Sequence, residues 1–144
     1  MQDQICREQA VAVHVRRGDY LLPENNRKYG NICTLQYYRN AMQYMKEKVS
    51  DARFYFFSND PEWVRENLSE GDSVIVNCNH GKENYLDMYL MSQCSHNIIA
   101  NSSFSWWGAW LNRNPDKIIV SPKRWFSHLD VSDAVCEDWI RING

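Results

Sequence analysis

The chain has 144 residues, 44% of them hydrophobic and 24% charged, so it is long enough to build one core and predicts a single domain over 1–144. The formal net charge of −2 gives no electrostatic case for nucleic acid or an anionic membrane as partner. The longest apolar runs have the length of strands and no signal-peptide pattern opens the chain, so no membrane span is predicted.

The cysteines are five in number, at wide and irregular spacing, and none belongs to a CxxC pair. A zinc site is therefore not predicted. Free thiols in a reducing compartment are the favoured interpretation, with one isolated disulfide as the alternative. Together with the lack of a signal peptide this predicts a cytoplasmic location. The five are Cys6, Cys33, Cys78, Cys94 and Cys136.

Short apolar runs alternate with helical patterns along the whole chain. The runs are nearly continuous, which is typical of parallel strands covered on both faces. In chain order we expect strand 10–15, helix 34–49, strand 53–57, a helix opened by Asp60 and Pro61, strand 73–76, helix 83–94, strand 97–100, helix 103–112 and strand 117–120. This alternation predicts an α/β fold, a Rossmann-like doubly wound parallel sheet of about five strands.

Polar side chains follow each of the predicted strands. Ligands of open α/β sheets bind outside the carboxyl ends of the strands, so these residues predict a polar rim along one edge of the sheet. Strand ends are polar in any protein, and the argument therefore depends on the chemistry of the individual groups. In chain order the residues are Arg16, Arg17 and Asp19; Ser58, Asn59 and Asp60; Asn77, Asn79 and His80; Asn101, Ser102 and Ser103; and Ser121 and Lys123.

The segment 14–20, HVRRGDY, directly follows the first strand. Alternation along a strand places His14 and Arg16 on one face and Arg17 on the other. We expect Arg16 to bind a phosphate through its fork of donors, and Arg17 to have a structural role. Asp19 either pairs with one of these arginines or acts in catalysis, and Gly18 is expected to permit a positive φ.

Two further residues of the rim have a structural and a functional interpretation of equal weight. His14 either hydrogen-bonds a nucleotide or is a satisfied core histidine. Asp60 either caps the helix that Pro61 continues, or accepts hydrogen bonds from the amino and imino groups of a guanine. The sequence leaves both pairs of alternatives open.

The segment 101–105, NSSFS, leads into helix 103–112. Ser102 or Ser103 is a suitable N-cap, and the free amides of the first turn form an anion site, although a simple capped helix explains the pattern too. The helix is apolar nearly all round, so we expect it to be buried. At least two of Trp106, Trp107 and Trp110 are predicted to lie in the core.

Several familiar nucleotide and metal motifs are absent. The chain has neither GxGxxG nor GxxxxGK[ST], which disfavours a dinucleotide site and a P-loop. It also has no Asp-x-Asp pair that could hold a divalent cation on a diphosphate. Arginine, hydroxyl groups and helix amides would then have to balance the charge of such a ligand, and no metal or other cofactor is predicted.

The motifs taken together resemble the α-1,2-fucosyltransferases of glycosyltransferase family 11. The resemblance is carried by residues 14–20 (HVRRGDY), 37–41 (YYRNA), 56–60 (FFSND) and 90–111, and it runs over most of 11–126. It implies transfer of L-fucose from GDP-fucose to a galactose-type hydroxyl of an oligosaccharide, with inversion and without metal. It also implies a GT-B architecture, of which this chain is the C-terminal donor-binding half without the N-terminal acceptor domain.

The resemblance extends to single residues. Arg16 corresponds to an arginine that clamps the β-phosphate in related fucosyltransferases, and His14 and Asp60 correspond to residues that contact the guanine. Ser102 and Ser103 correspond to a serine pair that faces the diphosphate. For the general base the candidates are Asp19 and Glu24. Glu24 lies about where α-1,6 relatives carry theirs, but Pro23 and Glu24 are equally compatible with an ordinary loop.

Three alternatives to the α-1,2-fucosyltransferase are kept. The first is a fucosyltransferase with a different acceptor, and the second is a catalytically inactive module that binds a GDP-sugar. The third is an α/β scaffold whose polar rim binds no nucleotide. Peripheral membrane association of a longer parent protein is also left open.

Overall fold

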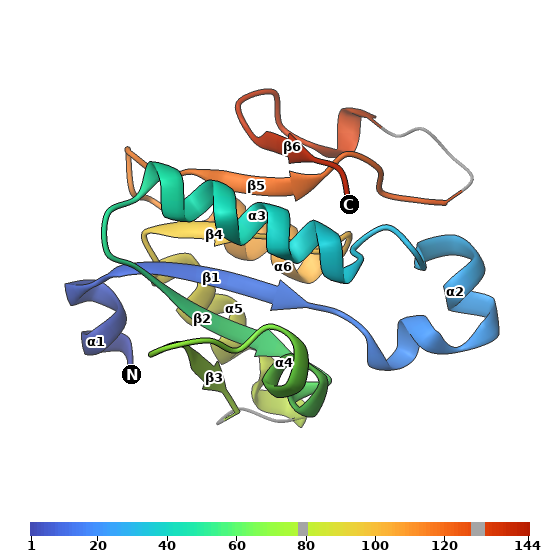
Figure 1. Cartoon of the computed structure of the whole chain (residues 1–144), viewed down its shortest axis with the longest axis horizontal. Helices are drawn as coiled ribbons and strands as arrows, with labels where there is room; N and C mark the ends of the chain where they lie inside the picture. The colour runs from blue at the N-terminus through green and yellow to red at the C-terminus, as the bar shows by residue number, and fades with distance from the viewer. Residues whose placement is uncertain (78–80, 128–131) are drawn as a thin grey trace.

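The computed structural model describes residues 1–77, 81–127 and 132–144, and within these ranges the chain forms one six-stranded parallel sheet (Figure 1). The strand order is β3-β2-β1-β4-β5-β6, which confirms the predicted Rossmann-like α/β class. The strands are β1 (Gln9–Val15), β2 (Ala52–Ser58), β3 (Val74–Val76), β4 (His96–Ile98), β5 (Ile119–Pro122) and β6 (Ile140–Ile142).

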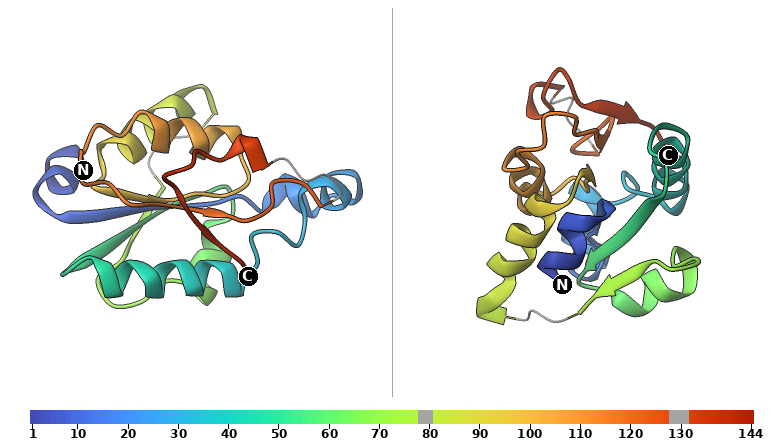
Figure 2. Two further views of the ribbon diagram at one scale, coloured as in Figure 1. Left: turned by 90° about the horizontal axis from the view of Figure 1, so that it is seen from above. Right: turned by 90° about the vertical axis from the view of Figure 1, so that its left-hand side faces the viewer.

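Helices cover both faces of the sheet, so the molecule has three layers (Figure 2). On one face lie α3 (Leu35–Lys48) and α4 (Pro61–Asn67). On the other lie α1 (Gln2–Arg7), α5 (Asn84–Gln93) and α6 (Ser103–Trp110). Helix α2 (Pro23–Tyr29) stands beyond the carboxyl ends of the strands (Figure 1). Short 3₁₀ turns are η1 (Gly18–Leu21), η2 (Gly81–Glu83) and η3 (Ser132–Ala134).

Strand β1 is buried on both faces, and its side chains alternate between the two layers. Val11, Val13 and Val15 pack in the cluster formed with α3 and α4. Ala10 and Ala12 belong to the cluster on the opposite face, with α1 and α5. This alternation explains the continuous apolar run of the sequence, and it fixes the next side chain of the second set, His14, on the α5–α6 face.

The order of the strands reverses between β1 and β4, and helix α3 anchors the carboxyl ends of both. The hydroxyl of Tyr38 donates to the backbone oxygen of His14 at 3.0 Å, and that of Tyr37 to the backbone oxygen of Ile99 at 2.6 Å. Both tyrosines are buried. The reversal point is where open sheets of this kind bind ligands. Here the two strand ends that flank it are both hydrogen-bonded to α3.

Three elements were not predicted, because each lacks the pattern that would reveal it. Strand β6 is only three residues long, with an exposed arginine at its centre, so the sheet has one strand more than expected. Helix α1 buries a single residue, Ile5, and α2 buries none. Helices this short and polar have no apolar stripe at a 3.6-residue period.

The prediction that helix 103–112 is buried is wrong. Only one side of α6 packs against the protein, where Gly108 approaches Met91 of α5 closely. Trp107 and Trp110 are 48% and 52% exposed, and Trp106 is partly buried beside Trp139. At least two of the three tryptophans were expected in the core, but a helix on the outside of a sheet has only one inward face.

The described cysteines, Cys6, Cys33, Cys94 and Cys136, are all free thiols, as favoured from the sequence. Cys78 lies outside the described residues, as do Asn79 and His80 of the predicted rim. In the described part of the chain, no helix has the length and apolar character needed to cross a membrane.

Candidate functional site

The residues predicted to share a face, His14 and Arg16, line one pocket at the carboxyl end of β1. Its volume is about 320 Å³, and it lies next to the reversal of strand order. We call it the β1 pocket. Its walls are formed by His14, Arg16, Phe57, Ser58, Asn59, Gly81, Asn84, Asp87 and Phe104. The residues come from β1, β2 and the starts of α5 and α6, so the pocket depends on the sheet for its shape.

His14 is only 5% exposed, and its Nδ1 has no hydrogen-bond partner among the described residues. Its ring lies 5.4 Å from that of Phe104, centroid to centroid. Burial, and to a lesser degree the charge of Arg16, lowers the pKa of His14 to about 3. The imidazole is therefore neutral at pH 7, with one donor and one acceptor. A buried polar atom without a partner is unusual, and a ligand in the pocket would satisfy it.

Arg16 is held by Asp19 in a bidentate ion pair. Its Nε and one terminal nitrogen each donate to a different carboxylate oxygen at 2.8 Å, and Asn59 donates to the same carboxylate at 3.1 Å. The hydrogen bonds from Arg16 lower the pKa of Asp19 below its ordinary value, so this carboxylate is ionised at neutral pH. Two donors of Arg16 are engaged in this way, and a guanidinium has five.

Arg17 points to the opposite side of the sheet, as predicted. Its guanidinium lies over the ring of Trp63 in α4, 4.1 Å from the centroid, and its Nε is 3.5 Å from the carboxylate of Asp60. The backbone N–H of Arg17 donates to the side-chain oxygen of Asn59 at 2.9 Å. These contacts attach the loop after β1 to α4, which is a structural role.

The structure places Asp60 at the start of α4, outside the walls of the β1 pocket. One carboxylate oxygen accepts a hydrogen bond from the backbone N–H of Trp63 at 3.2 Å, and the other faces Arg17. This is the N-cap of the structural interpretation. Both oxygens thus have partners within the protein, and Asp60 does not line the β1 pocket.

Gly18 does not have the positive φ that was expected of it, since the described glycines with positive φ are Gly71 and Gly81. The absence of a side chain serves close approach instead. A Cβ at residue 18 would lie 3.1 Å from the side-chain nitrogen of Asn59, which contacts Asp19. The glycine thus leaves room for the amide that supports the Arg16–Asp19 pair.

The serine pair flanks the pocket at the start of α6. Ser102 is the buried N-cap residue, but its side chain makes no cap hydrogen bond, and Ser103 is exposed. The hydroxyl of Ser105 closes this turn, bonding to the backbone of Ala100 at 3.2–3.3 Å. The next residue after the pair, Phe104, is the one that lines the β1 pocket.

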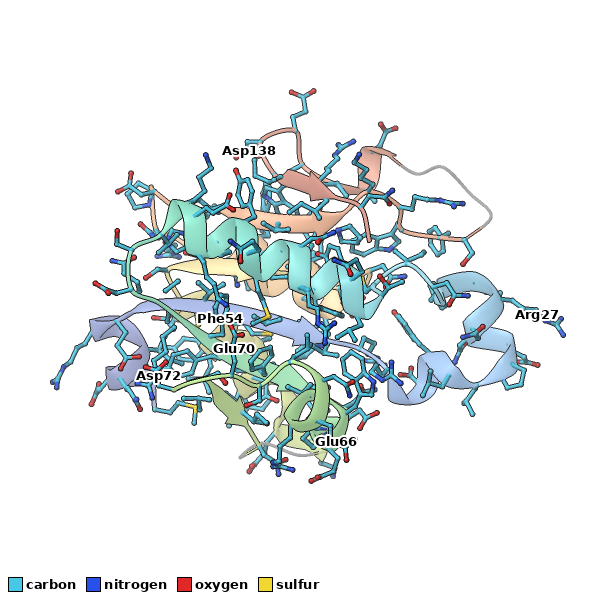
Figure 3. All side chains as sticks on the ribbon, in the orientation of Figure 1. Arg27, Phe54, Glu66, Glu70, Asp72 and Asp138 are labelled. Carbon is cyan, nitrogen blue, oxygen red and sulfur yellow. The ribbon has the colours of Figure 1, made fainter. Side chains whose placement is uncertain are left out.

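Glu24 lies in the first turn of α2 and is exposed. This segment is a helix rather than the loop considered from the sequence. Figure 3 shows Arg27 of the same helix extending away from the sheet, which illustrates how far α2 projects. Glu24 lines neither the β1 pocket nor the smaller pocket on the other side of Arg16.

Two polar residues of the pocket wall, Asn84 and Asp87 in the first turn of α5, were not predicted from the sequence. Their spacing of three places them on one side of that helix. The signal that could have found them is this polar pair at a helix start in an otherwise apolar segment. That Asn84 and Asp87 lie in the same pocket as His14 follows only from the fold.

In residues 1–77, 81–127 and 132–144, no three His, Cys, Asp or Glu side chains come together as a metal site would require. Metal independence stays a prediction.

Comparison with known proteins identifies the family. The sequence profile of Glycosyl transferase family 11 matches residues 3–143. The chain belongs to this family. The predicted resemblance to family 11 is therefore confirmed over nearly the whole chain.

Individual relatives agree with this family membership. The chain is 38% identical over 146 residues to an alpha-1,2-colitosyltransferase of Escherichia coli, covering 99% of the chain and 50% of the relative. It is 36% identical over 133 residues to the O-antigen biosynthesis glycosyltransferase WbnK of Escherichia coli, covering 92% and 44%. Galactoside alpha-(1,2)-fucosyltransferase 1 of Ateles belzebuth is 37% identical over 103 residues, covering 70% and 28%. The chain thus spans half or less of the length of these relatives.

Proposed function

We propose that this chain is the donor-binding half of an inverting glycosyltransferase that moves L-fucose from GDP-fucose to a galactose-type hydroxyl in α-1,2 linkage. The observation that carries the proposal is the β1 pocket, where a fixed arginine fork and a buried histidine with an unpartnered Nδ1 meet at the strand reversal. Family membership supports the reaction class, and the names of the relatives support the linkage.

The diphosphate and the guanine of the donor each have a matching group in the pocket. Arg16 has donors beyond those used by Asp19 and is assigned to the β-phosphate. Neutral His14 and the carboxylate of Asp87 are assigned to the guanine, whose imino and amino groups donate to a carboxylate. The geometry favours Asp87 over Asp60 for this contact, because Asp60 caps α4. Ser102 and Ser103 keep their assignment to the diphosphate.

The reaction forms one bond to C1 of fucose and breaks another. An acceptor oxygen attacks C1 from the face opposite the diphosphate, the bond from C1 to the phosphate oxygen breaks, and GDP leaves with the electron pair. Negative charge then grows on the diphosphate, where Arg16 stabilises it. The proton of the acceptor hydroxyl goes to a general base.

The geometry does not favour either predicted base. Asp19 is ionised but engaged by Arg16 through both oxygens, and its lowered pKa makes it a weak proton acceptor. We assign Asp19 to positioning Arg16. Glu24 is exposed on α2, outside the β1 pocket. The proposal assigns no base within the described residues.

GDP-colitose is a second candidate donor to compare with GDP-fucose, because one relative that matches 99% of the chain is named an alpha-1,2-colitosyltransferase. Colitose is fucose without the 3-hydroxyl, so the two donors share the GDP moiety and the reaction at C1. The two donors differ at the 3-position of the sugar, so contacts to the 3-hydroxyl of fucose would decide between GDP-fucose and GDP-colitose. GDP-fucose and GDP-colitose are therefore offered in parallel to the full-length parent enzyme, and the ratio of their kcat/KM values identifies the donor.

The test of donor binding is calorimetric titration of the chain with GDP, ADP and UDP, followed by GDP-fucose. We expect GDP to bind more tightly than the other two diphosphates, and GDP-fucose to compete with GDP. Equal affinities for the three nucleotides, or no binding of any, would contradict the proposal. The chain alone is expected to bind the donor without transferring fucose at the parent's rate, because orientation of the acceptor can supply several kcal/mol, up to about 7–11.

Metal independence is tested with the full-length parent enzyme. Since Arg16 and the serine pair are assigned to the diphosphate, the transfer rate should be unchanged in EDTA. A rate that collapses in EDTA and returns with Mg²⁺ or Mn²⁺ would show that a cation, and not Arg16, carries most of that charge.

A further inference from the structure

A second cavity begins on the other side of Arg16 from the β1 pocket. Its first part, of about 210 Å³, is lined by Arg16 and by residues of η1, α2 and the segment after α2. Its second part, of about 440 Å³, is lined by residues of α2 and by Pro122 and Ile142 at the carboxyl ends of β5 and β6. The two parts share Asn26, Gly30 and Asn31. We call the combined cavity the α2 groove.

The walls of the groove are fixed by side-chain hydrogen bonds around Asn101, which is 2% exposed. Its side-chain nitrogen donates to the backbone oxygens of Tyr29 at 3.1 Å and Trp125 at 2.9 Å. Its own backbone oxygen accepts from the hydroxyl of Tyr20 at 2.9 Å. Ser127 adds a second link, with its hydroxyl 3.1 Å from the backbone oxygen of Gly30. The cavity is thus a built feature, and its first part adjoins Arg16.

The lining of the groove is polar and positively charged. Lys123 and Arg124 lie on the segment after β5, with Arg27 on α2. Among the residues that the structure describes, no Asp or Glu side chain lines either part. Within the described residues none of these three cations forms an ion pair. Arg124 donates to the backbone oxygen of Ser127, which keeps its guanidinium at the wall of the cavity.

Amide side chains complete the surface. Asn26, Asn31 and Asn143 line the groove, and each planar amide can donate to one hydroxyl and accept from another. Asn31 lines both parts and has a φ of 59°, a left-handed conformation that asparagine adopts more readily than most other non-glycine residues.

We propose that the α2 groove is an acceptor subsite within this half of the enzyme, and that it binds a saccharide bearing a negative charge, which Lys123 and Arg124 recognise. The acidic group is a carboxylate or a phosphate on the acceptor, and the amides bind its hydroxyl groups. The inference rests on the proposed function in one respect. With the nucleotide of the donor in the β1 pocket, the acceptor sugar in the α2 groove lies on the other side of Arg16, and its hydroxyl can reach C1 of the donor.

The test follows amide signals by NMR while the chain is titrated, in the presence of saturating GDP, with three probes. These are galacturonate, galactose 1-phosphate and neutral methyl β-galactoside. The variant combines Lys123→Gln with Arg124→Gln, and the matched control is Arg113→Gln, an exposed arginine at the opposite edge of the sheet. Since Gly144 also lines the groove, the titrations are repeated with a chain extended by two glycines.

We expect at least one acidic probe to shift the signals of Asn31, Ser127 and Ile142 at lower concentration than the neutral sugar. Each exposed ion pair contributes modestly, so the preference should be about 5- to 10-fold and should weaken with salt. The double variant should lose it and Arg113→Gln should retain it. Preference for galacturonate alone identifies a carboxylate acceptor, and preference for galactose 1-phosphate alone a phosphorylated one.

Equal binding of the neutral and acidic sugars would overturn the inference, as would a preference that survives in the double variant. Shifts confined to Ser58 and Asn84 of the β1 pocket would also overturn it. GDP affinity is measured separately, by calorimetric titration of the same proteins without GDP or sugar present. A chain that binds acidic sugars in the groove but does not bind GDP would contradict the proposed donor site and leave the groove in place.

Discussion

The two sides of Arg16 are built in different ways. The β1 pocket is walled by residues at the ends of β1 and β2 and the starts of α5 and α6, so the hydrogen-bonded ladder of the sheet places them. The α2 groove is walled mainly by a helix and connecting segments, with Pro122 and Ile142 as its contribution from the sheet, and single side chains such as Asn101 and Ser127 hold the segments together.

This difference predicts where amino-acid substitutions alter ligand binding alone and where they also alter the shape of the cavity. A pocket formed by neighbouring strand ends keeps its shape as long as the sheet is intact, and substitutions there should change ligand binding more than architecture. A groove held by a few hydrogen bonds should lose its shape when one of them is removed. The following predictions test that distinction.

The largest effect is expected for Arg16→Ala. Charge-assisted hydrogen bonds contribute about 1.5–3 kcal/mol each, so the variant should bind GDP about 10²-fold more weakly. Arg17→Ala is the matched control, because Arg17 contacts Trp63 and Asp60 on the other side of the sheet and should leave GDP affinity unchanged. Calorimetry that shows damage for Arg17→Ala and none for Arg16→Ala would reverse the roles of the two arginines.

A pH effect on stability should identify His14 as a buried neutral group. Its pKa is lowered to about 3 in the folded protein and is about 6.5 when unfolded. Between these values the unfolded chain binds a proton that the folded chain does not. The free energy of unfolding should therefore fall with decreasing pH, by up to about 1.4 kcal/mol per unit from this residue.

Urea unfolding at pH 7 and pH 5 measures this contribution. The loss on acidification should be smaller in His14→Gln than in the unmodified chain, by about 2 kcal/mol. Some dependence should persist in the variant, because burial also lowers the pKa of His96. Identical pH dependence in the two proteins would show that His14 is accessible to protons in the folded state.

Asn101→Ala should separate the two regions. The substitution leaves the backbone oxygens of Tyr29 and Trp125 without their donor, and we expect a loss of about 2 kcal/mol in the free energy of unfolding. Sugar binding in the α2 groove should weaken while GDP affinity stays within about 2-fold, well under the tenfold that 1.4 kcal/mol represents. Equal losses of both would mean that groove and pocket form one unit.

In free energy, the smallest of the expected effects comes from substitutions of two aspartates, Asp87 and Asp60. Asp87→Asn replaces a charged acceptor in the pocket wall and should weaken GDP about 10-fold, with less effect on inosine diphosphate, which lacks the 2-amino group. Asp60→Asn should change GDP affinity little, because asparagine is also a good N-cap. The opposite ranking in calorimetry would return guanine recognition to Asp60.

The parts of the fold that sequence predicts are those with a strong local pattern. The continuous apolar run of β1 and the helix expected over 34–49 are found as predicted, and both contribute buried side chains to the cluster formed with α3 and α4. The tryptophans of α6 misled the prediction because composition does not say which side of a helix faces solvent. Trp107 and Trp110 point outward although their neighbours Gly108 and Ala109 are buried.

The candidate site shows the same limit. The grouping of His14 with Arg16 follows from strand alternation, which is local. The partner of Arg16 could not be chosen from the sequence, because Asp19 lies in a turn whose shape depends on Asn59 of another strand end. Asp87 and the α2 groove depend on contacts between distant segments. No spacing in the sequence reports such contacts.

The ion pair between Arg16 and Asp19 also has a consequence for the timing of ligand binding. Because Asp19 accepts from Nε and one terminal nitrogen of Arg16 at 2.8 Å, the protein itself orients the guanidinium before a nucleotide arrives. Ordering a long flexible side chain at the moment of binding costs about 0.5–1.5 kcal/mol. That entropy is lost here during folding instead, so encounter with the diphosphate should need no search among rotamers of Arg16.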